Sequence, residues 1–140
     1  MKLISKTNYK MNSKIVLDFI DAINNANLDK MVDLMTIDHV FVDSQDNKTI
    51  GKDKMRQAWM GYFALFPDYR IEINEILEKD NLIGIFGYAS GTYRNMITED
   101  KSNYWRIPAA WRVLVKENQI KCWQVYADNI IVLDIINKNK

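Results

Sequence analysis

The chain has 140 residues, 48% of them hydrophobic and 26% charged, and 19 Lys and Arg against 18 Asp and Glu give a formal net charge of +1. This length is typical of a single domain that buries roughly two-thirds of the surface exposed by its unfolded chain. The near-neutral balance argues against nucleic acid as the main partner, because phosphate binding usually requires a strongly basic face.

The counts of cysteine and histidine exclude two kinds of site. Cys122 is the single cysteine and cannot form an intrachain disulfide, and His39 is the single histidine, so no Cys/His zinc site is encoded. We therefore expect a reducing, cytoplasmic setting with no metal and no cofactor. No apolar run approaches the roughly 18 residues needed to span a bilayer, and the N-terminus lacks the apolar core of a signal peptide. We expect no membrane segment and no membrane partner.

The N-terminal part of the chain predicts a tail followed by a helix. Residues 1–10 are polar and are expected to form a flexible tail, and residues 11–140 a single domain. Ser13 is a suitable N-cap, and apolar residues follow it at helical spacing until about Asn25. The apolar positions of this helix are Ile15, Val16, Phe19, Ile20 and Ile23.

Two further helices are expected before residue 67. A short helix follows Asn27, and a longer one runs from Gly51 to Phe66, where Pro67 ends it because proline cannot continue a helix. The short helix is expected to bury Leu28, Met31, Val32 and Met35.

Between these two helices, Asp38–Ser44 has the composition of a strand, and the polar residues 45–49 have that of a turn. Side chains alternate between the faces of a strand, so Phe41 and Asp43 share one face. If that face is buried, Asp43 lies in or at the mouth of an apolar cavity. If the opposite face is buried, Asp43 is a solvated residue at the end of a strand.

From Tyr69 onward the hydrophobic period changes from 3.6 to 2, which predicts strands. Expected strands begin at Tyr69 and cover 82–93, 104–116 and 119–133, with turns at 79–81 and 117–118 and a loop at 94–103. Gly84, Gly87 and Gly91 in one strand indicate strong bending. We predict an α+β domain in which a curved antiparallel sheet forms a cone with three helices from the N-terminal half.

Several segments carry a resemblance to a known family. The order of elements resembles the SnoaL-like family of the nuclear transport factor 2-like superfamily, which is related to polyketide cyclases and ketosteroid isomerases, over about residues 13 to 135. This superfold hosts unrelated functions, so the resemblance predicts the fold better than the chemistry. The similar segments are Phe19–Asp29, Asp38–Asp43, Ile50–Asp53, Phe86–Tyr93, Trp105–Arg112 and Trp123–Asp128.

The resemblance implies a cone-shaped pocket and two candidate catalytic residues. Asp43 is similar in position to the aspartate that shuttles a proton in ketosteroid isomerases. The enolate-binding donors of those isomerases match Phe19 and Ile107, which cannot donate hydrogen bonds, so steroid isomerisation by that mechanism is not expected. Asp128 is near the position of an aspartate used by SnoaL-like cyclases. The spacing between Trp123 and Asp128 differs by about one residue from the spacing in those cyclases. A shift of one residue places a side chain on the opposite face of a strand.

The same pocket would be lined by large apolar side chains, suited to a flat ligand with few polar anchors. The alternative interpretation is that these side chains simply fill the core. The candidate ligand-binding residues are Phe19, Phe41, Trp59, Phe63, Phe86, Tyr88, Trp105, Ile107 and Trp123.

The outer face of the sheet is expected to carry Arg106 and Arg112, on the side opposite Trp105. Members of the superfamily often pair sheet against sheet, so the resemblance implies a homodimer through this outer face. The residues expected there are Tyr104, Pro108, Ala110 and Tyr126.

Three functional hypotheses remain open at this stage. The first is a small-molecule pocket protein that performs acid–base chemistry on a hydrophobic ligand, as an isomerase, cyclase or hydrolase, with Asp43 as base and Asp128 as second candidate. An apolar lining would raise the pKa of Asp43 into a useful range. The second is a non-catalytic ligand-binding or dimerisation module whose pocket is filled by aromatics. The third, an epoxide hydrolase-like reaction, requires an arginine between two aspartates inside the cone, where Arg106 is not expected.

Overall fold

The computed structural model describes the backbone of residues 2–140 and the side chains of residues 11–140. The first helix begins at Lys2, well before the expected N-cap at Ser13; the flexibility of residues 1–10 stays a prediction. The elements are α1 (Lys2–Asn24), α2 (Leu28–Asp33), β1 (Met35–Val42), β2 (Lys48–Ile50), α3 (Lys52–Leu65), β3 (Arg70–Lys79), β4 (Leu82–Thr92), the 3₁₀ turn η1 (Tyr93–Asn95), β5 (Tyr104–Lys116), β6 (Gln119–Tyr126) and α4 (Ile130–Lys138).

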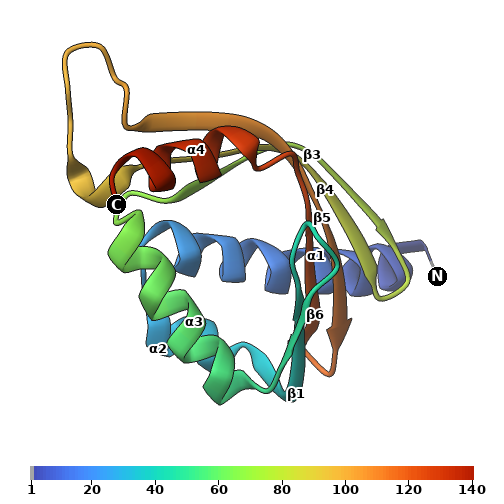
Figure 1. Ribbon diagram of the computed structural model, residues 1–140. Helices are drawn as coiled ribbons and strands as arrows, with labels where there is room; N and C mark the ends of the chain where they lie inside the picture. The colour runs from blue at the N-terminus through green and yellow to red at the C-terminus, as the bar shows by residue number, and fades with distance from the viewer. Residues whose placement is uncertain (1) are drawn as a thin grey trace.

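All strands belong to one curved sheet with the order β2-β1-β6-β5-β4-β3. The sheet is mixed rather than wholly antiparallel, because β1 pairs with β6 in parallel while the other neighbours are antiparallel. The sheet bends over the helices, with α1 running beneath it and α2 and α3 beside α1 (Figure 1). The expected α+β cone is therefore confirmed, and its core lies between the concave face and the helices.

The bend of the sheet has an identifiable origin in β3 and β4. The pairing shifts between Ile73 and Glu75, so Asn74 is an extra residue in β3 opposite Gly87 and Phe86. Such a bulge bends a strand and increases its twist. At Gly87 the backbones approach so closely that a Cβ atom would lie 1.8 Å from the carbonyl oxygen of Glu72. Only glycine is compatible with this approach.

Local interactions fix the ends of the helices and turns. Asn27 caps α2, since its side chain accepts a hydrogen bond from the backbone N–H of Lys30. At the end of α1, the side chain of Asn24 hydrogen-bonds both backbone groups of Ile71, at 2.8 and 3.1 Å, which satisfies the exposed edge of β3. The predicted turn between β5 and β6 is confirmed: Glu117 and Asn118 both have positive φ, as a two-residue hairpin turn requires.

Three sequence-based expectations about the elements are wrong. The expected strand 119–133 ends at Tyr126 and is followed by α4, because the Ile- and Val-rich run after Asn129 turns its buried residues, Val132 and Ile135, to one side of a helix. The expected turn 45–49 includes the start of β2, which pairs with the end of β1. Met35 opens β1 instead of closing α2.

The residues that the structure describes include neither a membrane-spanning helix nor a cluster of metal-binding side chains. Within residues 2–140, no helix has the length and apolar character needed to cross a bilayer. Within the described side chains, no three His, Cys, Asp or Glu residues gather in a way that would hold a metal ion. The cytoplasmic setting stays a prediction.

His39 is completely buried in β1 against Phe19. Its Nδ1 lies 2.8 Å from the carbonyl oxygen of Ile120, so Nδ1 carries the proton and donates it. Nε2 is buried without a partner, and protonating it would place an uncompensated charge in the core. Burial accordingly lowers the pKa of His39, outweighing the hydrogen bond to Ile120 and the nearby carboxylate of Asp38, which both raise it.

We expect Gly87→Ala to destabilise the protein by roughly 2–3 kcal/mol, because the new Cβ forces the backbones of β3 and β4 apart. Gly84→Ala is the matched control in the same strand, since its Cβ would be in ordinary contact with Phe86 at 3.7 Å. That variant should be neutral or stabilising by up to about 1 kcal/mol. Urea denaturation of the two variants measures the difference, and equal losses would contradict the proposed cause of the bend.

We expect the free energy of unfolding to fall as the pH decreases through and below 6.5. The folded protein resists protonation of His39, whereas the unfolded chain takes up a proton near its ordinary pKa, so stability is retained above that pH and lost below it. The contribution of one group is at most about 1.4 kcal/mol per pH unit. Denaturation curves between pH 5 and 8 test this, and His39→Phe should remove the dependence. An unchanged slope in that variant would assign the effect to other groups.

Candidate ligand-binding cavity

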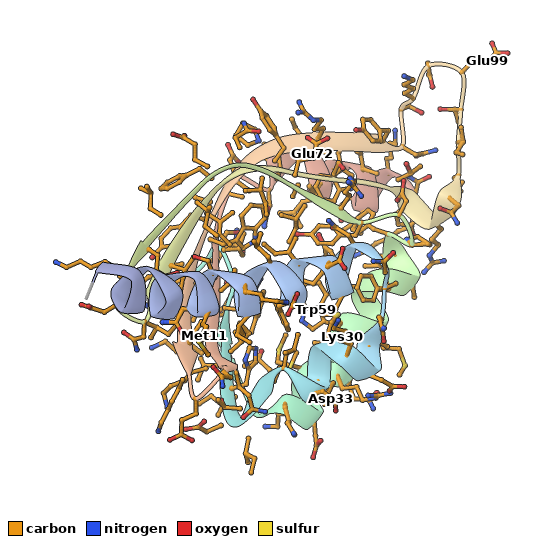
Figure 2. The ribbon with its side chains drawn as sticks, turned by 180° about the vertical axis from the view of Figure 1, so that it is seen from behind. Met11, Lys30, Asp33, Trp59, Glu72 and Glu99 are labelled. Carbon is orange, nitrogen blue, oxygen red and sulfur yellow. The ribbon has the colours of Figure 1, made fainter. Side chains whose placement is uncertain are left out.

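A cavity of about 240 Å³ lies between α3 and the concave face of the sheet. Figure 2 shows Trp59, one of its lining residues, in the space enclosed by the helices and the sheet. The wall is mainly aromatic and aliphatic, and it consists of Phe41, Asp43, Ser44, Met55, Ala58, Trp59, Tyr62, Tyr69, Ala89, Trp105, Ile107, Ala109, Trp111, Trp123, Val125, Ala127 and Asn129.

The aromatic rings of the wall form a connected series around Trp59. The ring of Trp59 lies 6.5 Å from that of Phe41 and 6.2 Å from that of Tyr62, both in edge contacts. Tyr62 and Tyr69 meet at 5.1 Å and 84°, and Tyr69 continues to Trp105 at 6.1 Å. These separations are those of favourable aromatic pairs, which hold the rings in fixed positions. Much of the cavity wall is therefore a continuous aromatic surface.

Tyr62 and Tyr69 bring polar atoms into this apolar wall. Neither hydroxyl has a hydrogen-bond partner among the described residues. Burial raises the pKa of Tyr62 well above its ordinary value, and burial together with the neighbouring Tyr62 does the same for Tyr69. Both phenols are therefore neutral throughout the physiological pH range and keep their protons as hydrogen-bond donors.

Asp43 lies at the cavity wall, but its carboxylate is engaged in a turn. Oδ1 accepts hydrogen bonds from the backbone N–H groups of Gln45 and Asn47, both at 2.9 Å, and Oδ2 accepts one from the Asn47 side chain at 3.1 Å. Partial burial raises the pKa of Asp43, but the hydrogen bonds from Asn47 and Gln45 more than offset it and leave the pKa below its ordinary value. The expected rise of this pKa in an apolar site is therefore wrong.

At the rim of the cavity, one contact joins the segment after β1 to the segment after β6. The side-chain amide of Asn129 donates a hydrogen bond to the hydroxyl of Ser44 at 2.7 Å. Asp128 is exposed and absent from the wall, and its Oδ1 accepts a hydrogen bond from the backbone N–H of Ile130 at the start of α4. The sequence places Asp128 on a strand and leaves its face open; because β6 ends at Tyr126, Asp128 lies instead in the turn that leads into α4.

The nine expected ligand-binding residues divide into three groups. Phe41, Trp59, Trp105, Ile107 and Trp123 line the cavity. Phe19 and Phe63 lie behind the wall, where Phe19 packs on Trp123 at 5.0 Å and Phe63 on Trp59 at 5.5 Å. Phe86 and Tyr88 are outside the cone, because in β4 the residues of the concave face are Ile83, Ile85 and Ala89, which alternate with them.

Three aromatic lining residues are absent from the nine candidates: Tyr62, Tyr69 and Trp111. Trp111 lies on the same face of β5 as Trp105, so the alternation of side chains along the strand could have identified it. Tyr69 precedes β3, but it begins the predicted alternation and shares a face with the buried Ile71, so the same period applies to it.

The outer face of the sheet matches the expectation for Arg106. Its guanidinium hydrogen-bonds the carboxylate of Glu72 at 2.8 and 3.0 Å and covers the ring of Tyr88, with Cζ 3.7 Å from the ring centroid. Glu72 belongs to β3, the strand at one edge of the sheet (Figure 2). The described wall therefore contains one carboxylate, Asp43, and no Lys, Arg or His, so it lacks an arginine between two aspartates. The homodimer through the outer face stays a prediction.

Comparison with known proteins identifies the family. The family model for the SnoaL-like domain matches residues 16–123, so the chain belongs to the SnoaL-like family. Among curated proteins, none matches the sequence.

Solved structures share the fold at low sequence identity. A candidate SnoaL-like polyketide cyclase from Jannaschia sp. CCS1 superposes with a TM-score of 0.78 at 14% identity, covering 91% of this chain and 92% of the other. An LEH-like epoxide hydrolase from M. tuberculosis has a TM-score of 0.76 at 12% identity, covering 93% of this chain and 92% of the other. A protein from Catenulispora acidiphila with a ketosteroid isomerase-like fold, in complex with trimethylamine, has a TM-score of 0.69 at 17% identity, covering 80% and 83%. These likenesses show the fold alone.

We expect Asp43→Ala to cost about 1 kcal/mol of stability, because two backbone N–H groups of the turn lose their acceptor. Asp43→Asn retains an oxygen at the Oδ1 position and should lie within about 0.5 kcal/mol of the wild type. Chemical denaturation above pH 6 compares the two. If the asparagine variant loses as much as the alanine variant, the negative charge rather than the acceptor geometry holds the turn.

Proposed function

We propose that this protein binds a small, mainly apolar molecule in the cavity between α3 and the concave face of the sheet. The observation that carries the proposal is the cavity itself: about 240 Å³ remains open although four tryptophans and two tyrosines contribute to its wall. A core filled by its own aromatics, the alternative expected from the sequence, would leave no such space.

The volume limits the ligand. Sites for drug-sized ligands usually measure about 300–1,000 Å³, so this cavity suits a smaller molecule, such as a single substituted ring. The low polarity of the wall favours an apolar body, since burying apolar surface contributes about 25 cal/mol per Å². The rim groups Ser44 and Asn129 bond each other, which leaves few polar anchors there.

Acid–base catalysis by Asp43 is a second candidate. It is supported by one observation, the position of the carboxylate in the cavity wall. A lowered pKa makes the carboxylate a weaker base, so this candidate requires a ligand with an already acidic proton. Asp43→Asn separates the two functions: it would remove a catalytic activity while leaving ligand affinity within about twofold.

We expect Ala109→Leu to lower the affinity for the ligand by roughly tenfold or more, because the larger side chain occupies the cavity. Ala110→Leu is the matched control, since Ala110 is the next residue of β5 and lines the grooves of the outer face. Isothermal titration calorimetry with acetophenone and ethylbenzene measures the affinities. Equal affinities of the two variants, or no heat of binding with the wild type, would contradict a ligand site in this cavity.

A further inference from the structure

The inference below rests on the proposed function and concerns the chemical class of the ligand. The cavity wall contains two kinds of unpartnered polar group. The indole Nε1 atoms of Trp59 and Trp105 have no partner, and both atoms are sealed from contact. They are therefore out of reach of a ligand.

The phenol oxygens of Tyr62 and Tyr69 differ from these indoles in one respect. They also lack partners among the described residues, yet they are not among the sealed polar atoms. Tyr69 is only 8% exposed, and it is a lining residue of the cavity. Its ring neighbour Tyr62 lines the same cavity and is half-buried.

The position of this pair within the wall is also informative. Tyr62 comes from α3, and Tyr69 from the segment that leads into β3, so two separate parts of the chain bring the rings together. Along the series of ring contacts, Trp59 separates the two tyrosines from Phe41, the ring nearest to Asp43 in the sequence.

A hydroxyl without a hydrogen-bond partner in an apolar wall lowers the stability of the folded protein, and a bound acceptor removes this penalty. A buried polar group without a partner typically costs about 1–3 kcal/mol, and a phenol O–H is a good donor to a carbonyl or ether oxygen. We propose that the cavity binds a neutral, largely apolar molecule through an acceptor oxygen contacted by the hydroxyls of Tyr62 and Tyr69.

The charged groups of the wall favour a neutral ligand. The described lining residues include no Lys, Arg or His that would balance an anionic ligand, and the Asp43 carboxylate repels one. A cationic ligand would find the carboxylate engaged by three hydrogen bonds from the turn and would face two phenol donors elsewhere in the wall.

A set of four ligands of nearly equal shape tests the class. Acetophenone carries the neutral acceptor, ethylbenzene lacks it, benzoate is the anionic analogue and 1-phenylethylammonium the cationic one. With the wild-type protein, calorimetry should give the tightest binding for acetophenone, by about three- to tenfold over ethylbenzene, the range expected for one or two neutral hydrogen bonds. Benzoate and the ammonium ion should bind more weakly than ethylbenzene.

Variants of the two tyrosines test whether their hydroxyls cause the preference for acetophenone over ethylbenzene. Tyr62→Phe and Tyr69→Phe keep the rings, so they should fold with unchanged or slightly higher stability, and each should reduce the preference for acetophenone while leaving ethylbenzene affinity within about twofold. Tyr126→Phe, on the exposed outer face, is the control and should change neither. The infrared carbonyl stretch of bound acetophenone should lie at lower frequency in the wild type than in the double variant.

The outcomes are distinguishable. Equal binding of acetophenone and ethylbenzene to the wild type overturns the inference and leaves the cavity as a ligand site. Tighter binding of the ammonium ion than of the ketone, or a preference for the ketone that persists in the double variant, also overturns it. Failure of all four ligands to bind contradicts both the inference and the proposed function.

Discussion

The close approach of Gly87 to the carbonyl oxygen of Glu72 is the contact on which the cavity depends. A flat sheet would contact the helices along one plane and leave no enclosed space. With the bulge at Asn74 beside this contact, β3 and β4 bend together, and β5 and β6 follow because they are hydrogen-bonded in series. One half of the sheet then packs on α1 while the other half faces α3 across the cavity.

The cavity exists at a cost that the rest of the fold must offset. In well-studied cores, unfilled apolar volume that solvent does not enter costs about 24 cal/mol per Å³, which sets an upper bound of several kcal/mol for this space. Two sealed indole N–H groups and two unpartnered phenols add to that cost. A bound molecule would recover the first term by filling the volume, and the phenol part of the second by accepting from the hydroxyls, while the two indoles would stay unpartnered. Native cores usually avoid such features, which is the physical reason for reading them as functional.

The sequence predicted the architecture because the hydrophobic period changes once, from helical spacing before Pro67 to alternation after Tyr69. It also placed Trp59, Trp105 and Trp123 in the wall, since each points inward by simple periodicity. The errors have physical causes. The segment after Asn129 is rich in Ile and Val, residues that favour strands, yet burial of Val132 and Ile135 on one side selects a helix.

Other features of the site were beyond sequence reasoning. The pKa of Asp43 depends on three hydrogen bonds that exist only because the chain turns back at Asn47. Phe86 and Tyr88 were assigned to the wrong face because one face of β4 had to be chosen without knowing its register with β3. The pairing of Tyr62 with Tyr69 is a tertiary contact between α3 and the chain that follows it, and no local pattern encodes it.

The distribution of tryptophan has a practical consequence. The chain contains four tryptophans, and all four, Trp59, Trp105, Trp111 and Trp123, line the same cavity. The ultraviolet-excited emission of the protein above 330 nm therefore originates almost entirely from one small region of the molecule, with no background from the surface. A shift in the emission maximum reports on that region alone, so intrinsic fluorescence can follow the state of the cavity without an attached label.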